Sequence, residues 1–133
     1  MAVLGLGASY NNGTRDMTNA FLNNGVACVG WMAADYPALH KFFKHIKMGD
    51  IIYIKAKTPQ VGLIIKGIGV VVDDTIFTNR RLGQACIKVK WKWRGNERLG
   101  RIADKYNVRN NTMYEEYNPE IITRVIELLL SDS

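Results

Sequence analysis

The stretch that decides the fold is residues 25–74, which contains GVACVGW (25–31), PALHKFFKHIKMGDIIYIKAK (37–57) and VGLIIKGIGVVVDD (61–74). The first segment predicts an apolar strand that ends in a glycine and a large aromatic residue. The second predicts an amphipathic helix that turns into a strand, and the third predicts a long strand. This order predicts a small curved sheet with a helix packed on it, an architecture that is typical of binding domains.

A helix that begins at Pro37 is the best-defined element of this stretch. Proline suits the first turn of a helix, because its missing N–H has no partner there in any case. Four apolar residues follow at the i, i+3, i+4 and i+7 spacing of one helix face, namely Leu39, Phe42, Phe43 and Ile46. We therefore expect this face to pack on the sheet.

Two strands follow the helix. Gly49-Asp50 turns the chain into a strand at 51–57, and Asp73-Asp74 ends the nearly unbroken apolar strand at 63–72. An apolar run of this kind is typical of a central strand that is buried on both faces. Its two glycines, Gly67 and Gly69, have no side chains to pack, so we expect a bend or bulge where a small barrel curves.

The segments on either side supply the remaining elements. Residues 3–8 predict a short strand and 9–13 a polar loop, after which Asp16 can cap a short helix that ends at Asn23-Asn24-Gly25. Residues 84–93 alternate between apolar and polar, which is typical of a strand with one buried face. The two tryptophans of that strand, Trp91 and Trp93, share its apolar face, so at least one should be in the core, or both should form one aromatic platform.

The C-terminal part is partly ambiguous. Residues 94–107 match no element clearly, and 108–114 predict a last short strand. Asn118-Pro119 supplies the cap and first turn of a closing helix, whose expected buried residues are Ile122, Val125, Ile126 and Leu129. The expected fold class is therefore α+β, a small pseudo-barrel of five or six mostly antiparallel strands with about three helices around it.

Length and composition are those of one globular domain spanning residues 1–133. The chain is 47% hydrophobic and 23% charged, which differs from the composition of disordered proteins. No apolar run approaches the roughly 20 residues that a membrane helix needs. The first residues have no basic segment ahead of a long apolar one, so we expect no secretory signal, no membrane association and a cytoplasmic protein.

The sequence offers no recognisable catalytic or metal-binding pattern. Cys28 and Cys86 each lie in an apolar run and are expected to be buried, reduced thiols. His40 and His45 are five residues apart, so they cannot share one helix face as metal ligands. No nucleophile triad, phosphate-binding loop or dinucleotide fingerprint is present. We therefore expect a protein that is not an enzyme and that needs no metal or cofactor.

Positive charge is concentrated in one part of the chain. The net charge is +6, and residues 80–109 alone hold ten basic and two acidic side chains, a local charge of +8. Such asymmetry favours an anionic partner, first of all nucleic acid, although a solvated basic face would look the same. The candidates for contact with a phosphate or nucleic-acid backbone are Lys88, Lys90, Lys92, Arg94, Arg109 and Asn110. The three lysines could instead protect an edge strand from aggregation, and the Arg109-Asn110 loop could cap a turn.

Several segments, taken in order, resemble the PUA-like superfamily. They are the strand ending in Gly30-Trp31, the helix with a Phe-Phe pair, IKMGDIIYIKA, IKGIGVVVDD, IKVKWKW and RNNTMYEEYNPEIITRVIELL. The resemblance covers residues 25–130 and is to EVE-type domains and the related modified-base-reading modules of modification-dependent restriction enzymes. It implies a pseudo-barrel that binds nucleic acid, in several members by turning a modified base into an aromatic pocket. Trp31 is the residue that carries over to that pocket.

A base pocket needs a flat aromatic surface and a few polar groups for the base edge. Stacking on an aromatic side chain contributes about 1–3 kcal/mol per base. Trp31 can supply that surface, Tyr36 and Tyr53 are candidate second walls, and Ser9, Asn11 and Asn12 could contact the base edge. Each of these aromatic residues could instead be part of the core.

The sequence therefore predicts a non-catalytic nucleic-acid-binding module that recognises a flipped or modified base in an aromatic pocket. Two other functions fit the same residues. The pocket could hold a small nucleotide or nucleotide-derived signal, or the lysine-bearing strand could be part of a protein-interaction module. The sequence does not distinguish DNA from RNA as the partner, and it does not indicate the oligomeric state.

Overall fold

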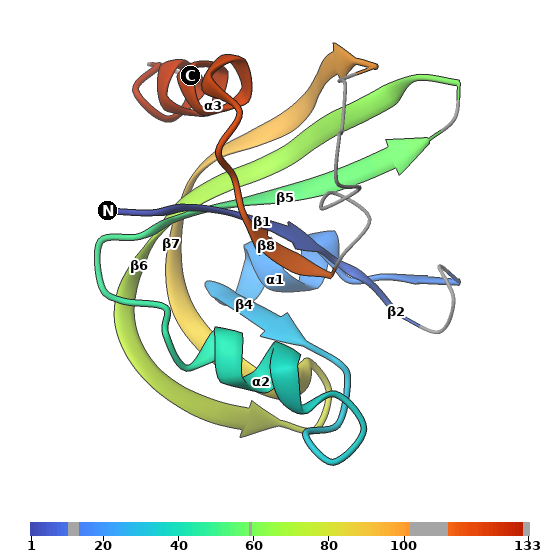
Figure 1. Cartoon of the computed structure of the whole chain (residues 1–133), viewed down its shortest axis with the longest axis vertical. Helices are drawn as coiled ribbons and strands as arrows, with labels where there is room; N and C mark the ends of the chain where they lie inside the picture. Colours follow the sequence, from blue (N-terminus) through green and yellow to red (C-terminus); the bar gives the residue numbers. More distant parts are fainter. Residues whose placement is uncertain (11–13, 59, 102–111, 132–133) are drawn as a thin grey trace.

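The structure is a computed structural model that describes residues 1–10, 14–58, 60–101 and 112–131 (Figure 1). Within these residues the elements are, in chain order, β1 (Val3–Gly7), β2 (Ser9–Tyr10), β3 (Arg15–Asp16), α1 (Thr18–Asn24), β4 (Val26–Val29), α2 (Pro37–Phe43), β5 (Ile51–Thr58), β6 (Gly62–Asn79), β7 (Gly83–Gly100), β8 (Met113–Glu115) and α3 (Pro119–Leu129). No helix among them is long and apolar enough to cross a membrane.

Six strands form one curled sheet in the order β4-β7-β6-β5-β1-β8, and β2 pairs separately with β3. Among the described strands of this sheet, β1 and β5 are the one parallel pair, and the other neighbouring pairs are antiparallel. Figure 1 shows the long strands β6 and β7 curving around β4 and α1. The expected α+β fold, a small pseudo-barrel of mostly antiparallel strands with helices around it, is confirmed.

The curvature comes from irregular pairing between the two longest strands. The β6–β7 register shifts several times, and two of the shifts fall at Gly67 and Gly69, so the bend expected at these glycines is confirmed. Two boundaries were predicted wrongly. β6 continues through Asp73-Asp74 to Asn79, and β7 continues to Gly100 through residues that had matched no element. β6 and β7 pair with each other in one long hairpin, and this pairing keeps their polar ends extended. Local sequence does not reveal such pairing.

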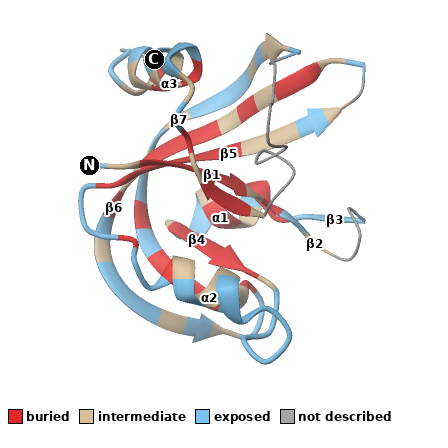
Figure 2. Cartoon of the chain, viewed as in Figure 1, coloured by how far each residue is buried: buried red, intermediate tan, exposed pale blue. Residues whose placement is uncertain are grey.

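The buried apolar residues form two clusters, one on each face of the sheet, and Figure 2 marks the buried residues along the chain in red. Along β5, Ile52 and Ile54 belong to the inner cluster with Phe21 of α1 and Phe43 of α2. The alternate residues of β5 belong to the outer cluster, which contains buried residues of α3. Successive side chains of a strand point to opposite faces, so both faces of the first half of β5, residues 51–54, are buried.

Trp91 and Trp93 do not form one aromatic platform. Trp91 packs against the inner cluster and donates its indole N–H to the carbonyl oxygens of Phe21, at 3.0 Å, and Val26, at 3.1 Å. Trp93 packs against the outer cluster. In the ladder, Trp91 pairs with Gly69 and Trp93 with Ile68, so β7 holds one extra residue between them. This bulge interrupts the alternation that the sequence predicts.

The cap expected at Asn118 is confirmed, whereas the N-cap of α1 is Met17, which makes no side-chain capping hydrogen bond, and Asp16 lies one residue before it. The Asp16 carboxylate accepts hydrogen bonds from the backbone N–H and the hydroxyl of Thr18 at the start of α1. The Asn118 side chain accepts from the backbone N–H groups of Glu120 and Ile121 at the start of α3. The buried face of α3 is rotated from the expected one. Its fully buried residues are Ile121, Val125 and Leu128, while the other expected residues, Ile122, Ile126 and Leu129, are partly buried.

The expectation of two reduced thiols is wrong, because Cys28 and Cys86 form a disulfide. The two residues lie directly opposite one another in the β4–β7 ladder, with 4.1 Å between their Cα atoms. They are 58 residues apart in the chain, so only the strand pairing brings them together. Both side chains are buried, as the sequence predicts.

Candidate functional site

The two edges of the curled sheet, β4 and β8, approach each other at Trp31. This residue follows the end of β4, and its indole N–H donates to the hydroxyl oxygen of Thr112, just before β8, at 3.1 Å. Among the described residues, the two edge strands are not paired with one another, so the ladder of the described sheet is not closed here. The Trp31–Thr112 hydrogen bond therefore spans a seam between two strands that are far apart in sequence.

A cavity of about 440 Å³ lies at this seam. It is lined by side chains from the segment before α2, from α2 itself and from the start of β8, namely Trp31, Tyr36, Ala38, Leu39, Phe42, Thr112 and Met113. Of the four residues expected on one helix face, Phe43 and Ile46 are buried in the core, although α2 ends at Phe43, before Ile46. Leu39 and Phe42 are partly buried and line the cavity. The walls are thus mainly apolar, with a hydroxyl group at one side.

Trp31 is not a core residue, since 37% of it is exposed, and Tyr36 is 44% exposed. Their ring centroids are 4.5 Å apart, with 46° between the ring planes. Local hydrogen bonds hold this segment. The Tyr36 N–H donates to the Met32 carbonyl at 3.0 Å, and the His40 ring of α2 contacts the Trp31 carbonyl oxygen. Of the expected pocket residues, these two are brought together.

The expected role of Tyr53 as a pocket wall is wrong. Tyr53 is fully buried on the outer face of β5, where its hydroxyl donates to the Glu116 carboxylate at 2.6 Å and lies 2.7 Å from the Tyr114 hydroxyl. Burial, together with Tyr114 and Glu116, raises the pKa of Tyr53 far above its usual value, so this hydroxyl stays protonated. The alternation of residues along β5 shows that Tyr53 lies on the opposite face from Ile52 and Ile54. It does not show which of the two faces lies near Trp31.

Of the three residues expected to contact the base edge, Ser9, Asn11 and Asn12, the structure describes only Ser9. Ser9 is exposed in the small β2–β3 ladder, where it pairs with Asp16, and it does not line the cavity. Asn11 and Asn12 lie outside the described residues. In their place, the structure puts Thr112 and Met113 at the cavity. The polar segment around Thr112 is visible in the sequence, but its position opposite Trp31 depends on closure of the sheet.

The expected ridge of cationic side chains on β7 does not border the cavity. Lys88, Lys90 and Lys92 are exposed, but none lines it. Lys88 and Lys90 alternate with residues of the inner cluster and so point from the opposite face of the sheet. Beyond the bulge, Arg94 donates to Asn19 of α1 on the inner side instead. Arg109 and Asn110 lie outside the described residues.

A different basic group is linked by contacts of Tyr10 to Gly30, the residue before Trp31. It consists of Arg15, Arg80 and Arg81, all exposed, and is called the arginine rim below. Arg15 donates to the Arg81 carbonyl at 3.3 Å, which joins β3 to the turn between β6 and β7.

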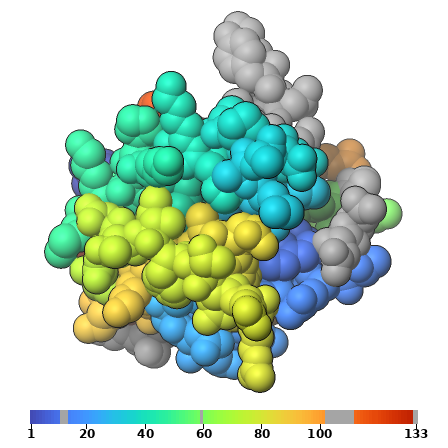
Figure 3. Space-filling model, turned by 90° about the horizontal axis from the view of Figure 1, so that it is seen from below, coloured from blue at the N-terminus to red at the C-terminus, as the bar shows by residue number. Residues whose placement is uncertain are grey.

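Tyr10 connects the arginine rim to the Trp31 segment. Tyr10 pairs with Arg15 in the β2–β3 ladder, and its hydroxyl donates to the Leu82 carbonyl at 2.6 Å. Its ring lies so close to Gly30 that a Cβ there would be 2.9 Å from it. Figure 3 shows this face, with the segment before α2 above the end of the β6–β7 hairpin. Basic residues at 80–81 were part of the charged segment, but their link through Tyr10 to the residue before Trp31 depends on tertiary contacts.

Lys55 lies beside the same seam and makes stability depend on pH. Its Nζ and the Thr112 carbonyl oxygen would lie 3.8 and 3.7 Å from a Cβ at Gly7. Burial, with a smaller effect from Lys57, lowers the pKa of Lys55 to about 8. The unfolded chain, with a lysine pKa of about 10.4, then binds more protons between these values. We therefore expect the free energy of unfolding to rise from pH 8 toward pH 10.

Urea unfolding at pH 7.0 and pH 9.5 measures this effect. Lys55→Met should remove most of the rise seen in the wild-type protein. Lys90→Met is the matched control, because Lys90 is exposed on another strand. An undiminished rise in Lys55→Met would show that another group is responsible.

No group of three or more His, Cys, Asp or Glu side chains that could hold a metal ion occurs among the described residues. The cavity chemistry within that part of the chain therefore consists of aromatic faces, apolar walls and a hydroxyl group. Such a site can hold a flat, partly apolar molecule by stacking and shape.

Sequence comparison assigns the chain to a family. Residues 32–116 match the family described as "Domain of unknown function (DUF8426)", and the chain belongs to it. The matched region begins at the residue after Trp31 and includes α2 and the strands β5 to β8. No curated protein has a significant sequence match.

Two solved structures share the fold. One is the YTH domain of the Zygosaccharomyces rouxii MRB1 protein in complex with N6-methyladenosine RNA, with 11% sequence identity, a TM-score of 0.61, and coverage of 99% of this chain and 87% of that one. The other is Rpa0253 from Rhodopseudomonas palustris, with 13% identity, a TM-score of 0.53, and coverage of 98% and 96%. The similarity is one of fold, and the resemblance to EVE-type domains stays a prediction.

Proposed function

We propose that this member of the DUF8426 family is a non-catalytic nucleic-acid-binding module that holds an extruded base in the cavity beside Trp31. The observation that carries the proposal is an exposed indole at the seam between β4 and β8, with apolar walls around it, and with the arginine rim linked through Tyr10 to the residue before it. The shared fold of an RNA-binding YTH domain supports it as an analogy.

The distance between the Trp31 and Tyr36 rings means that Tyr36 must move when a base binds. Optimal carbon–carbon contact is about 3.5–4.0 Å, so a base between two rings requires the rings to be roughly 7–8 Å apart. The Trp31 and Tyr36 centroids are 4.5 Å apart, so Tyr36 occupies the position of a sandwiched base. Tyr36 must therefore turn aside on binding, and as an exposed side chain it can change rotamer within nanoseconds.

The apolar walls favour a methylated base over an unmodified one. Leu39, Phe42 and Met113 offer no charged group to the cavity. Burying one methyl group contributes about 0.8 kcal/mol, which corresponds to roughly a fourfold preference. N6-methyladenine in RNA is the first candidate, because the YTH domain with this fold was solved with RNA that carries it.

The arginine rim supplies contacts to the sugar–phosphate backbone. Contacts of this kind position a strand without reading its sequence, and each one makes affinity fall as salt increases. The rim therefore favours a polymer over a free nucleotide. It replaces the lysine ridge as the proposed backbone contact near the cavity.

Fluorescence polarisation with labelled single-stranded oligonucleotides tests the proposal. We expect RNA carrying one N6-methyladenosine to bind about fourfold more tightly than the unmodified RNA, with affinity falling steeply between 50 and 200 mM salt. A matched DNA pair tests the choice of sugar. Absence of binding at low salt, or stabilisation by mononucleotides but not by oligonucleotides, would contradict the proposal.

A further inference from the structure

A second cavity lies on the same side of the sheet as α1 and has a different chemistry. Its volume is about 250 Å³, and it lies between the start of α1 and the strands β6 and β7. The residues that line it are mostly polar, namely Asp16, Thr18, Asn19, Leu22, Lys66, Arg94, Gly95 and Asn96. It shares no residue with the Trp31 cavity.

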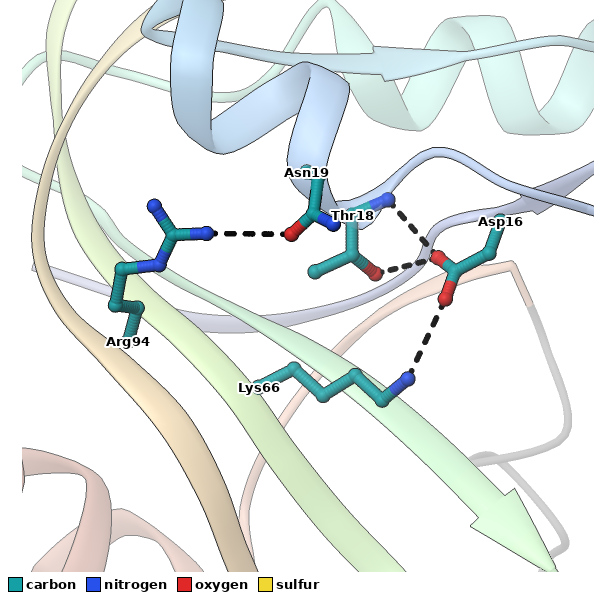
Figure 4. Close-up of polar contacts among 5 residues, drawn as sticks. All are labelled: Asp16, Thr18, Asn19, Lys66 and Arg94. Atoms are coloured by element: carbon teal, nitrogen blue, oxygen red, sulfur yellow. Dashed lines mark hydrogen bonds and ion pairs between the residues drawn. The ribbon is translucent and has the colours of Figure 1, made fainter.

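The charges of this cavity favour an anion. Lys66 and Arg94 extend from β6 and β7 toward α1, where Asp16 and Asn19 lie (Figure 4). The Asp16 carboxylate accepts two hydrogen bonds from Thr18 and lies 3.4 Å from the Lys66 ammonium. Two cations and one carboxylate leave one positive charge in excess.

Asp16 is ionised and already engaged. Burial raises the pKa of its carboxyl, but the Thr18 hydrogen bonds and Lys66 outweigh that effect and hold the pKa below its usual value. The carboxylate therefore neutralises Lys66 in the empty cavity, through an ion pair longer than the usual 2.7–2.9 Å of a charge-assisted hydrogen bond. Lys66 can turn to a stronger acceptor without losing a short bond.

Arg94 has donors left for a ligand. In the described part of the chain its guanidinium makes one hydrogen bond, from Nη2 to the Asn19 side-chain oxygen at 3.2 Å. A guanidinium has five N–H donors in a planar fork that matches two phosphate oxygens. Because the Asn19 oxygen accepts from Arg94, its amide N–H₂ is left as a further donor.

We infer that this cavity is a phosphate-binding site, formed by Arg94, Lys66 and Asn19. The inference rests on the proposed function, in which the phosphate belongs to the strand whose base enters the Trp31 cavity. The same chemistry would also accept the phosphate of a free nucleotide.

Backbone hydrogen bonds place the two cavities close enough together for one nucleic-acid strand to reach both. The Gly7 N–H donates to the Thr112 carbonyl, and the Met17 N–H donates to the carbonyl of the next residue, Ala8, each at 2.7 Å. Thr112 lines the first cavity, and Thr18, next to Met17, lines the second. These steps put the two threonines within about 17 Å of each other.

NMR titration of ¹⁵N-labelled protein at constant ionic strength tests the inference. The probes are inorganic phosphate, adenosine 5′-monophosphate and a short single-stranded RNA, with chloride as the reference anion. We expect all three to shift the Arg94 side-chain N–H and the Asn19 amide, and only the RNA and the monophosphate to shift the Trp31 indole N–H.

Two variants with the same charge change provide the control. Arg94→Gln should weaken RNA binding about tenfold, equally for modified and unmodified bases, and lower the salt slope by about 0.7. Arg98→Gln removes an exposed arginine of the same strand that does not line the cavity, and should change affinity less than about twofold.

The possible results separate the two proposals. Shifts at the Trp31 indole without shifts at Arg94 and Asn19, or equal effects of the two arginine variants, would overturn the phosphate site and leave the base pocket standing. Shifts at Arg94 and Asn19 with an unmoved Trp31 indole would support the phosphate site and contradict the base pocket. A larger response to the RNA than to the monophosphate identifies the polymer as the source of the phosphate.

Discussion

Trp31→Ala is expected to weaken binding of single-stranded oligonucleotides roughly 5- to 150-fold while the protein stays folded. Loss of base stacking costs about 1–3 kcal/mol, and 1.4 kcal/mol corresponds to a factor of ten. The residue is 37% exposed and follows the end of β4, so its removal leaves the two buried clusters intact. Fluorescence polarisation measures the affinity, and circular dichroism checks the fold.

Two further variants separate stacking from other effects. Trp31→Phe keeps an aromatic face but loses the hydrogen bond to Thr112, so it should retain most of the affinity. Tyr117→Ala is the matched control, because Tyr117 is an aromatic residue that is 74% exposed and does not line the cavity. A folded Trp31→Ala protein with wild-type affinity would rule out the base pocket.

Gly5→Ala is expected to lower the free energy of unfolding by about 3 kcal/mol. Gly5 lies in β1 between β5 and β8, and a Cβ there would be 2.3 Å from the Tyr114 ring. That ring is buried, and its hydroxyl lies 2.7 Å from the Tyr53 hydroxyl, which in turn donates to Glu116. Overpacking alone costs about 1–3 kcal/mol, and displacement of buried hydrogen-bonding groups adds to it.

Urea unfolding of Gly5→Ala and Gly7→Ala measures the effect of that ring contact. Gly7 is in the same strand, but a Cβ there would meet its nearest neighbour at 3.6 Å, an ordinary contact. Gly7→Ala should therefore change stability by less than about 1 kcal/mol. Equal losses in the two variants would mean that the loss in Gly5→Ala reflects a general intolerance of side chains in β1.

The buried Tyr53–Glu116 pair explains why one aromatic residue was assigned to the wrong place. Glu116 also accepts the backbone N–H of Asn118, at 3.1 Å, next to the cap of α3. The pair therefore connects β5 to the segment that leads into the last helix. A tyrosine in an alternating strand is compatible with either a ligand pocket or this arrangement, and only the neighbours on each face distinguish them.

The sequence by itself indicated most of the helices and strands, but not the full extent of β6 and β7. Local periodicity and turn chemistry depend on residues a few positions apart, so the α2 stripe, the Asn118 cap and the glycine bends could be predicted. Trp31, which follows Gly30 after a short apolar strand, was predicted either as an exposed stacking surface or as a core residue, and it is exposed.

Only the tertiary structure decided what surrounds that indole. Thr112 contacts Trp31, and the arginine rim is linked through Tyr10 to the residue before Trp31. Strand pairing and closure of the sheet make both connections, whose hydrogen bonds join residues more than 60 positions apart. One extra residue in β7 turns Arg94 away from Lys88 and Lys90, because a bulge reverses which face the following side chains take. Register and closure are set by the summed packing of whole strands, and no short sequence pattern encodes that sum.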